Sequence, residues 1–549
     1  MNATLLAVNA KYVHASLAVW FVAGGAAKYA QMPHTVRVAE ATINQNPADI
    51  LARVCAGSPE LVGISAYIWN AALLPELLAG LRARLPGVRV LLGGPEAGHN
   101  PAHWLTNGAD YVLCGEGERN FAALLDALSA RDSAALGTIP GLCFLADGTL
   151  RQNPQAPPLQ ELLDPYSDNY FSALDGRIAY IETARGCPFQ CAYCLSAGEK
   201  VRFFPLDAVK SQLDALAQSG TQTIKLVDRT FNCHAQRAHE LLEYVIAMQT
   251  DCCFHFEVAA DLFDERTLAL LQTAPPGRIQ LEIGLQSFHM PTLDAVSRKT
   301  DLEKAQKNIR RLLAGRNIHI HIDLIAGLPL ETLPIFEQSF NRAYALDAHM
   351  LQIGFLKLLH GSRLRAQAQD LDIRFRSEPP YEIIRSPWLS KAELDIIRRT
   401  ENALQATANK GRFLSLLAYV LTASGLPPFA FFRGLGESVQ NHATALEQYA
   451  AQLFSYCATL PNVDENTLRD CMICDLLSMS KGKNMPQFLK SHGAKRKQTA
   501  AAASAALGRT IDYNETAVLS GGTGIFADSE KRDAVTGLYA LRKTLLTAE

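Results

Sequence analysis

Three cysteines stand within the segment RGCPFQCAYC, which runs from Arg185 to Cys194. Their spacing is Cys187-x-x-x-Cys191-x-x-Cys194. Thiolates at such spacing can wrap around one iron–sulfur cluster. Four protein thiolates would saturate the cluster, whereas three leave one iron open to an external ligand, as catalytic metal sites do. The spacing therefore predicts a cluster with one iron available to a small molecule.

A structural zinc ion is the first alternative for these thiols, and unrelated core thiols are the second. Zinc in a structural site takes four protein ligands. This loop carries no further His or Cys, and the nearest ones, Cys233 and His234, follow the next expected strand. The missing fourth ligand favours the cluster.

The composition of the whole chain limits its class. Its 549 residues predict three or four domains, and 48% of them are hydrophobic. The net charge of -2 gives no support for a nucleic-acid partner. The opening residues show no secretory signal, and no early apolar run is long enough to cross a membrane. We therefore expect a cytoplasmic protein, in which the 12 cysteines do not form a disulfide framework.

The first 135 residues alternate apolar strands with helical stretches, which predicts an α/β Rossmann-like domain built on a parallel sheet. The expected strands are TLLAVN, HTVRVAEA, ELVGISAYIW, VRVLLGGPEAG and ADYVLCGEGE. A ligand of such a sheet lies beyond the carboxyl ends of the strands. Glycines end the fourth and fifth strands, so we expect the ligand there.

A proline-rich, polar linker is expected over residues 136–172, and a second alternating series follows over residues 173–366. Its strands are RIAYIETARG, TIKLVDRT, CFHFEVAA, RIQLEIGLQS, HIHIDLIAGLP and MLQIGFLKLL. Six such βα units predict a partial TIM-type (β/α)6 barrel, with its chemistry on the loops after the strands. Residues 367–549 show mainly helical periodicity, which predicts a mostly helical C-terminal domain.

The cysteine motif and the barrel pattern together resemble the radical S-adenosylmethionine (SAM) superfamily, over about residues 177–360. Cys187, Cys191 and Cys194 match its CxxxCxxC motif, with the aromatic Tyr193 before the last cysteine. The resemblance implies a 4Fe-4S cluster whose fourth iron is chelated by the amino and carboxylate groups of SAM. One electron from the reduced cluster then yields a 5′-deoxyadenosyl radical, which abstracts hydrogen. A flavodoxin or ferredoxin is the expected electron donor.

The same resemblance implies a set of SAM-binding residues at the strand ends. Tyr193 is expected to contact the adenine through its backbone, and Arg202 to pair with the methionine carboxylate. The remaining candidates are Glu257, Gln286 and Ser287 around the ribose and methionine, and the stretch from Ile325 to Leu328 against the adenine. Glu257 and Arg202 could instead belong to structural ion pairs.

A doubly wound domain in front of this barrel resembles the cobalamin-dependent branch of the superfamily. Small residues at the strand ends would let the backbone approach a bulky corrin. The implied cobalamin-binding residues are Ser65, Tyr67, Trp69, Asn70, Gly93, Gly94, Pro95, Glu96, Gly115, Glu116 and Gly117. The alternative is a degenerate domain that packs against the barrel and binds nothing.

One departure concerns the lower ligand of cobalt. Classical cobalamin domains carry Asp-x-His-x-x-Gly, whereas around His14 the Asp and Gly positions are held by Tyr12 and Leu17. We therefore do not expect His14 to bind cobalt.

Four functions remain open at this point. The first is methyl transfer to an unactivated carbon of an unknown small-molecule or peptide substrate. The second is a rearrangement or cyclisation with the same cofactors and no methyl transfer. Methylthiotransfer to transfer RNA ranks low, because no extra cluster cysteines are visible in the front domain and no small terminal β-barrel is visible. A non-catalytic cobalamin or light sensor is the fourth.

The C-terminal region carries two further features. Cys471 and Cys474 form a CxxC in a helical pattern, which could hold a second cluster with Cys457, although buried helix thiols are commoner. The stretch PPFAFFRGLGE, residues 427–437, resembles an uncharacterised extension in a subgroup of these proteins.

Overall fold

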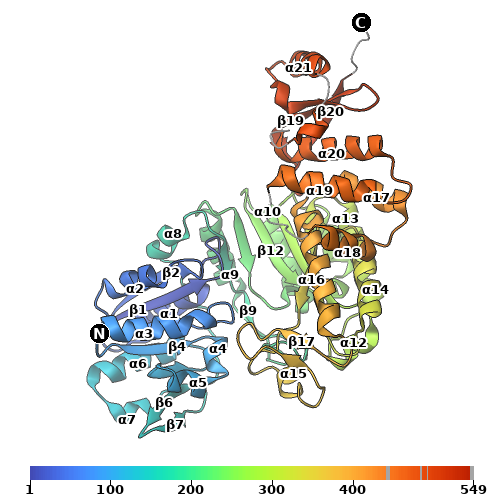
Figure 1. The fold of residues 1–549 in the computed structure, drawn as a ribbon. Helices are drawn as coiled ribbons and strands as arrows, with labels where there is room; N and C mark the ends of the chain where they lie inside the picture. The colour runs from blue at the N-terminus through green and yellow to red at the C-terminus, as the bar shows by residue number, and fades with distance from the viewer. Residues whose placement is uncertain (440–444, 482–484, 491–492, 545–549) are drawn as a thin grey trace. The chain divides into compact units, whose positions relative to one another are not determined.

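A computed structural model describes residues 1–439, 445–481, 485–490 and 493–544 of the chain (Figure 1). The chain divides into two compact units. The first comprises residues 1–258, 296–299 and 356–386, and the second comprises residues 259–295, 300–355 and 387–549. The first unit therefore contains both the front domain and the cysteine motif.

The front domain is built on a seven-stranded sheet in the order β2-β1-β3-β4-β5-β6-β7. Strands β1 to β5 run parallel, as predicted, and β6 and β7 add an antiparallel hairpin that was not predicted. The bounds are β1 Asn2–Asn9, β2 Thr35–Thr42, β3 Leu61–Ser65, β4 Arg89–Gly93, β5 Tyr111–Leu113, β6 Leu142–Ala146 and β7 Thr149–Gln152. The helices are α1 Leu17–Tyr29, α2 Pro47–Cys55, α3 Leu74–Arg84, α4 Pro95–Gly98, α5 Pro101–Thr106, α6 Glu118–Ala130 and α7 Ser133–Leu136.

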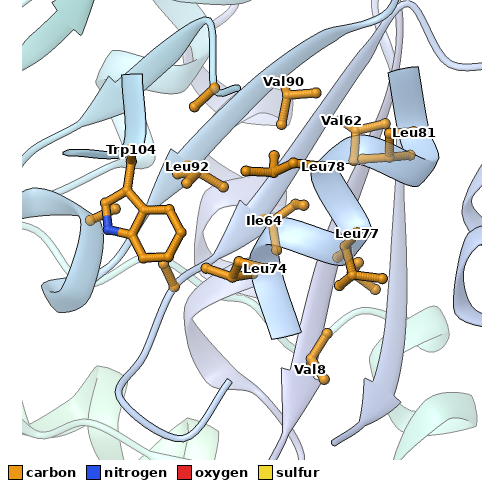
Figure 2. Close-up of a cluster of buried hydrophobic side chains, with 14 of the residues drawn as sticks. Val8, Val62, Ile64, Leu74, Leu77, Leu78, Leu81, Val90, Leu92 and Trp104 are labelled. Atoms are coloured by element: carbon orange, nitrogen blue, oxygen red, sulfur yellow. The ribbon is translucent and has the colours of Figure 1, made fainter. Parts of the chain in front are cut away.

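A buried apolar cluster fixes α3 on this sheet (Figure 2). Leu74, Leu77, Leu78 and Leu81 recur at helical spacing and form one apolar stripe. They pack against strand residues that are fully buried, namely Val62, Ile64, Val90 and Leu92. Each such side chain contributes roughly 1.5–3 kcal/mol when it is fully buried. This packing holds the carboxyl ends of β3 and β4 in place.

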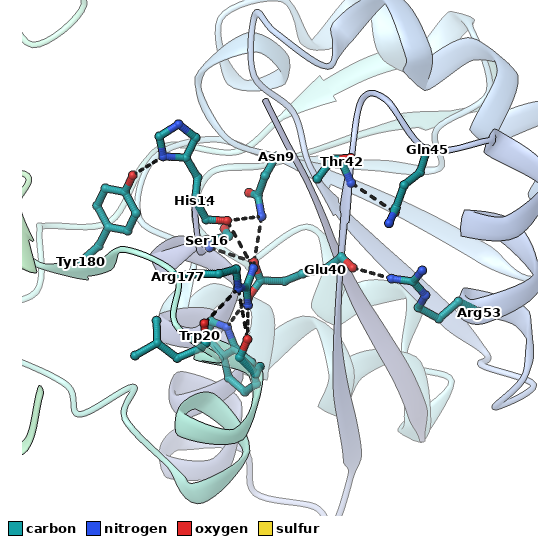
Figure 3. A network of polar contacts seen from close by, with 12 residues as sticks. Asn9, His14, Ser16, Trp20, Glu40, Thr42, Gln45, Arg53, Arg177 and Tyr180 are labelled. Carbon is teal, nitrogen blue, oxygen red and sulfur yellow. Dashed lines mark hydrogen bonds and ion pairs between the residues drawn. The ribbon is translucent and has the colours of Figure 1, made fainter. Parts of the chain in front are cut away.

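A buried polar network ties the front domain to the start of the barrel segment (Figure 3). Glu40 at the end of β2 accepts hydrogen bonds from the side chain of Asn9 at 2.8 Å and from the indole of Trp20 at 3.0 Å. It also accepts from the backbone N–H of Ser16 at 3.0 Å and forms an ion pair with Arg177 at 2.9 Å. Both charged side chains are only 8% exposed. Glu40 therefore joins β1, β2, α1 and the segment before the barrel.

The barrel segment contributes three parallel strands to each unit, and all six predicted strands are confirmed. In the first unit β11 lies between β8 and β12, and in the second β14 lies between β13 and β15. The bounds are β8 Ala179–Ile181, β11 Thr223–Leu226, β12 Cys253–Val258, β13 Ile279–Gln286, β14 Ile318–Ala326 and β15 Met350–Phe355. The helices of this segment are α8 Asp168–Leu174, α9 Leu206–Ala217, α10 Ala235–Ala247, α11 Glu265–Leu271, α12 Met290–Ala295, α13 Leu302–Ala314, α14 Leu333–Tyr344 and α15 Arg363–Ala366. Short ladders are formed by β9 Ala184–Arg185 with β10 Arg202–Phe203 and by β16 Arg374–Phe375 with β17 Ile383–Arg385.

The C-terminal region is mostly helical, as predicted, and it also contains a three-stranded antiparallel sheet that was not predicted. Its helices are α16 Lys391–Ala406, α17 Leu414–Ser424, α18 Pro428–Ser438, α19 Leu446–Ala458, α20 Glu465–Ser480 and α21 Gly493–Leu507, and its strands are β18 Thr516–Val518, β19 Gly524–Arg532 and β20 Tyr539–Thr544. Across the described part of the chain, no single helix has the length and hydropathy of a membrane span. The pair α17 and α18 passes that test only jointly and is bent by 112°.

Candidate active site

The three predicted cluster ligands lie on one loop, which is held together by hydrogen bonds within its own backbone. Cys187 N–H donates to the carbonyl of Glu199 at 3.2 Å, and Cys194 N–H donates to that of Cys191 at 3.1 Å. Gly186 has φ of +97°, and a Cβ there would lie 2.7 Å from the carbonyl oxygen of Lys200. A residue with a side chain would therefore strain the loop at the position just before the first cysteine.

The thiols fit an iron–sulfur cluster by their chemistry. All three are free; Cys187 and Cys191 are buried, and Cys194 is half-buried. Within the described ranges, no three His, Cys, Asp or Glu side chains converge on the position of a single metal ion. A cluster does not require such convergence, because each thiolate binds a different iron. A guanidinium N–H of Arg298 reaches the sulfur of Cys191 at 3.7 Å, a distance at which it can hydrogen-bond a thiolate.

The SAM-binding candidates of the first unit are surrounded by protein groups. The side chain of Tyr193 is half-buried, and burial raises its pKa. Arg202 donates to the carbonyl of Leu159 and pairs with Glu116. Glu257 pairs with Lys225 at 3.1 Å. The structural ion pairs that the sequence left open are thus present, and a role for either residue toward SAM stays a prediction.

The candidates of the second unit fall into two kinds. Gln286 and Ile325 are half-buried at the ends of β13 and β14, where Gln286 has φ of +68° beside a register shift. Such backbone strain is common at functional sites. Ser287 and Leu328 are fully buried, and the hydroxyl of Ser287 donates to Glu331 at 2.5 Å. Ser287 therefore uses its side chain to hold another protein group.

Glu331 is a buried carboxyl group that sequence reasoning did not single out. One of its oxygens also accepts from Ser339 at 3.2 Å, and burial raises its pKa from 4.5 to about 7. The only signal for it was its place directly after the segment GLPL.

We expect Glu331 to make the stability of the protein depend on pH. Because burial favours the neutral acid in the folded state, its contribution is complete below pH 4.5 and is lost as the pH rises through about 7. A shift of this size corresponds to roughly 3 kcal/mol at most. Thermal unfolding between pH 5 and 8 should therefore show a smaller fall in Tm for Glu331→Gln than for wild type. An equal fall in both proteins would contradict this assignment.

The end of β3 carries four of the cobalamin-binding candidates. Asn70 is buried, and its side chain donates to the carbonyls of Ser65 at 2.8 Å and Val8 at 3.1 Å. Trp69 is 43% exposed, donates to the carbonyl of Val8, and stacks on Tyr67 with ring centroids 4.3 Å apart. Asn70 thus builds the loop, whereas Trp69 presents an exposed aromatic ring that is stacked on the half-buried Tyr67.

The two glycines at the end of β4 differ in the space around them: a side chain would find open space at Gly93 but a close backbone contact at Gly94. A Cβ on Gly93 would meet no atom within 4 Å. Gly94 has φ of +94°, and a Cβ there would lie 2.7 Å from the carbonyl oxygen of Ala66. Pro95 begins α4, and the buried carboxylate of Glu96 accepts from the hydroxyl of Tyr381 at 2.5 Å. Burial raises the pKa of Glu96, and its carboxyl group faces the segment after β15.

We expect opposite outcomes for alanine at these two glycines. Gly94→Ala should lower the free energy of unfolding by about 1–3 kcal/mol, because a non-glycine residue is strained at this φ and its Cβ clashes. Gly93→Ala should change it by less than about 0.5 kcal/mol. Urea unfolding of both variants measures the difference. Equal losses of unfolding free energy in the two variants would contradict the described difference in space between Gly93 and Gly94.

The end of β5 also directs a carboxylate toward the barrel segment. Glu116 lies between Gly115, which has φ of +81°, and Gly117, which precedes α6. Its oxygens pair with Arg202 and, at 3.4 Å, with Arg185. Glu116 is therefore held by protein cations, and its predicted contact with cobalamin remains untested.

His14 also lies near the junction of these segments. Its ring nitrogen shares a hydrogen bond of 2.6 Å with the hydroxyl of Tyr180 on β8, and burial lowers its pKa. Nothing in this geometry tests the expectation that His14 is not a cobalt ligand.

Each of the three parts of the chain matches a known protein family. Residues 181–343 match the Radical SAM superfamily and residues 3–125 match the B12 binding domain. Residues 369–516 match a family described as a protein of unknown function (DUF4080). The chain therefore contains a radical SAM domain. Because a B12 binding domain precedes it, the chain carries the two cofactor-binding modules that cobalamin-dependent radical SAM enzymes combine.

Individual proteins agree with this assignment. The cobalamin-dependent radical SAM methyltransferase TokK of Streptomyces tokunonensis is 25% identical over 354 residues, which cover 60% of this chain and 51% of TokK. An anaerobic magnesium-protoporphyrin IX monomethyl ester cyclase of Rubrivivax gelatinosus is 25% identical over 307 residues, which cover 52% of this chain and 54% of the cyclase. The chain spans about half the length of these curated relatives.

A solved structure supports the fold. The radical SAM methyltransferase TsrM from Kitasatospora setae, with cobalamin and a [4Fe-4S] cluster bound, superposes with a TM-score of 0.56 at 20% identity. The match covers 69% of this chain and 79% of TsrM. The superposition confirms the predicted fold class, and the family matches confirm the two predicted cofactor-binding modules; the roles of individual site residues stay predictions.

Proposed function

We propose that this protein is a cobalamin-dependent radical SAM methyltransferase that methylates an unactivated carbon of a small-molecule or peptide substrate. The observation that carries the proposal is that the glycine-lined end of β5 and the cysteine loop meet directly, through Glu116 and the two arginines at the base of the loop. Two cofactors that act on one substrate atom must be held close together.

The residues have separate tasks in this proposal. Cys187, Cys191 and Cys194 hold the cluster, and the Gly93 end of β4 with the stacked ring of Trp69 holds cobalamin. When bound, the cluster with SAM supplies a hydrogen-abstracting radical, and cobalamin supplies a methyl group. The protein's part is to orient the substrate carbon between them and to exclude water. TokK, which is named as a methyltransferase, supports this function.

Cyclisation or rearrangement without methyl transfer is the second candidate. The similarity to the magnesium-protoporphyrin cyclase favours it, because that relative is also 25% identical and its match covers 52% of the chain, against 60% for TokK. Both candidates use the same cofactor sites, so only the products separate them.

The test is anaerobic reconstitution with iron, sulfide and cobalamin, followed by incubation with a reductant, SAM carrying a deuterated methyl group, and a host extract. Flavodoxin or ferredoxin is the proposed physiological reductant. Methyl transfer predicts S-adenosylhomocysteine, 5′-deoxyadenosine and a deuterium-labelled product. The cyclase function predicts 5′-deoxyadenosine without S-adenosylhomocysteine or label. If neither S-adenosylhomocysteine nor 5′-deoxyadenosine forms, both candidate functions are contradicted.

A matched pair of variants tests the cobalamin edge. Gly93→Leu should fold normally, since no atom lies within 4 Å of its Cβ position, yet its side chain should block the corrin. Gly521→Leu, at an equally open glycine in the second unit, is the control. We expect the cobalamin spectrum to be lost only in Gly93→Leu. Full cobalamin binding by that variant would place the cofactor elsewhere.

A further inference from the structure

The loop that carries the cysteines is closed at its base by two arginines that face each other. β9 and β10 form an antiparallel ladder of two residue pairs, in which Arg185 is opposite Arg202. Residues 186–201 form the loop between these strands. Like charges directly opposite each other destabilise a strand pair. This ladder therefore needs counter-charges from elsewhere.

Three carboxylates supply them, and two come from the front domain. Arg185 pairs with Glu118 at 2.6 Å and with Glu182 at 2.7 Å. Glu116 contacts both arginines, at 3.4 Å from Arg185 and in a closer pair with Arg202. Both arginine side chains are less than a fifth exposed, so water screens these pairs only partly.

Glu116 is placed to connect the proposed binding of cobalamin with the ordering of the cysteine loop. It follows Gly115 at the end of β5, on the edge where the front domain is proposed to bind cobalamin. Its second oxygen also accepts from the backbone N–H of Leu159 at 2.8 Å, in the segment before the barrel. A ligand that shifted the backbone at Gly115 would therefore shift the carboxylate that holds the base of the cysteine loop.

We propose that Glu116 is a positioning residue that clamps the base of the cysteine loop to the cobalamin edge, so that cobalamin binding and ordering of the loop stabilise each other. Its carboxylate bridges the like-charged ladder, and the effect passes from β5 through Arg185 and Arg202 to the loop. The coupling to cobalamin rests on the proposed function, whereas the clamp itself does not. By linkage, cobalamin binding and loop order must change each other by the same factor.

The first experiment uses the full chain without cofactors. Amide hydrogen exchange of residues 186–201 is compared for wild type, Glu116→Gln and Glu161→Gln. Glu161 is an exposed carboxylate paired with Lys28 and serves as the control. We expect the loop to exchange about tenfold faster in Glu116→Gln alone, because a partly buried charge pair is broken. If residues 186–201 exchange at the wild-type rate in Glu116→Gln, the proposed clamp is wrong.

A double-mutant cycle separates the clamp from general destabilisation. If Glu116 acts through Arg202, Glu116→Gln combined with Arg202→Gln should exchange no faster than the faster single variant. Additive effects in the cycle would contradict action through Arg202. A global loss of stability would instead accelerate exchange across the sheet, including β1 and β3.

The second experiment adds cobalamin to the reconstituted protein. In wild type we expect slower exchange of residues 186–201 and a changed electron paramagnetic resonance signal of the cluster, and in Glu116→Gln neither change despite bound cobalamin. Retained coupling in the variant would overturn the inference. If wild type binds no cobalamin, the proposed function fails, while the cofactor-free exchange still decides the clamp.

Discussion

Replacing Cys187, Cys191 or Cys194 by alanine is expected to reduce iron incorporation to background and to lower SAM cleavage by at least about a thousandfold. The loop offers three thiols, and each is expected to bind one iron. With one thiol missing, two irons lack a protein ligand and the cluster is not retained. Iron and sulfide content after anaerobic reconstitution, with 5′-deoxyadenosine release under reduction, measures the effect.

Two other cysteines provide controls for this expectation. Cys233 lies beyond the next strand and was the nearest candidate for a fourth ligand. Cys474 belongs to the CxxC on α20, where both thiols are half-buried and burial raises the pKa of each to about 11. Cys233→Ala and Cys474→Ala should keep full iron content and nucleoside release. Loss of iron in Cys474→Ala would instead indicate a second cluster, and full activity in Cys187→Ala would remove the proposed site.

Replacing Glu40 by alanine is expected to lower the free energy of unfolding of the first unit by about 3–5 kcal/mol. The change removes the carboxylate that neutralises the guanidinium of Arg177, which is 8% exposed and keeps only backbone carbonyls as acceptors. It also removes the acceptor for the indole of Trp20 and for the side chain of Asn9. Buried groups that lose their partner cost more than the bond itself contributes. Urea unfolding followed by tryptophan fluorescence measures the loss.

The control for Glu40 is an exposed ion pair on the same unit. Glu161 also contacts several groups, including Lys28 and Arg119, yet its carboxylate lies at the surface. Glu161→Ala should unfold at nearly the wild-type urea concentration, because solvent screens exposed pairs. If Glu40→Ala and Glu161→Ala had similar effects, burial would not be what makes the Glu40 network important.

The cysteine motif and the order of elements could be predicted because they depend on local sequence. Spacing alone placed Cys187, Cys191 and Cys194 on one loop after the first barrel strand. Apolar runs and alternation predicted the five parallel strands of the front domain and all six strands of the barrel segment. These patterns reflect burial within a single element, so no knowledge of distant residues is needed.

The partners of the charged side chains could not be predicted, because tertiary packing sets them. Glu96 contacts Tyr381 and Glu116 contacts the two arginines at the base of the cysteine loop, and neither set of partners was predicted. Arg202 lies 86 residues from Glu116 in the chain. Nothing in the local sequence marks such a pair. Ser287 is a similar case, since its acceptor Glu331 lies on another strand connection.

There are also physical reasons why strands such as β7 and β19 were not predicted from the sequence. β7 is exposed along its whole length, so it lacks the apolar alternation that marks a buried strand. β19 carries charged residues such as Asp528 and Arg532 and is preceded by a glycine-rich turn. β7 is held mainly by antiparallel pairing with β6, which single-element patterns do not reveal, whereas β19 also buries Ile525, Phe526 and Ala527 in its first half.

The central claim is that the protein leaves one iron of the cluster for SAM, and Mössbauer spectroscopy tests it most directly. The enzyme is reconstituted anaerobically with iron-57, and spectra are recorded with and without SAM. We predict that about one quarter of the iron signal shifts when SAM is added, since only one of four irons lacks a thiolate. Spectra that are identical with and without SAM, in protein carrying a full cluster, would contradict the account.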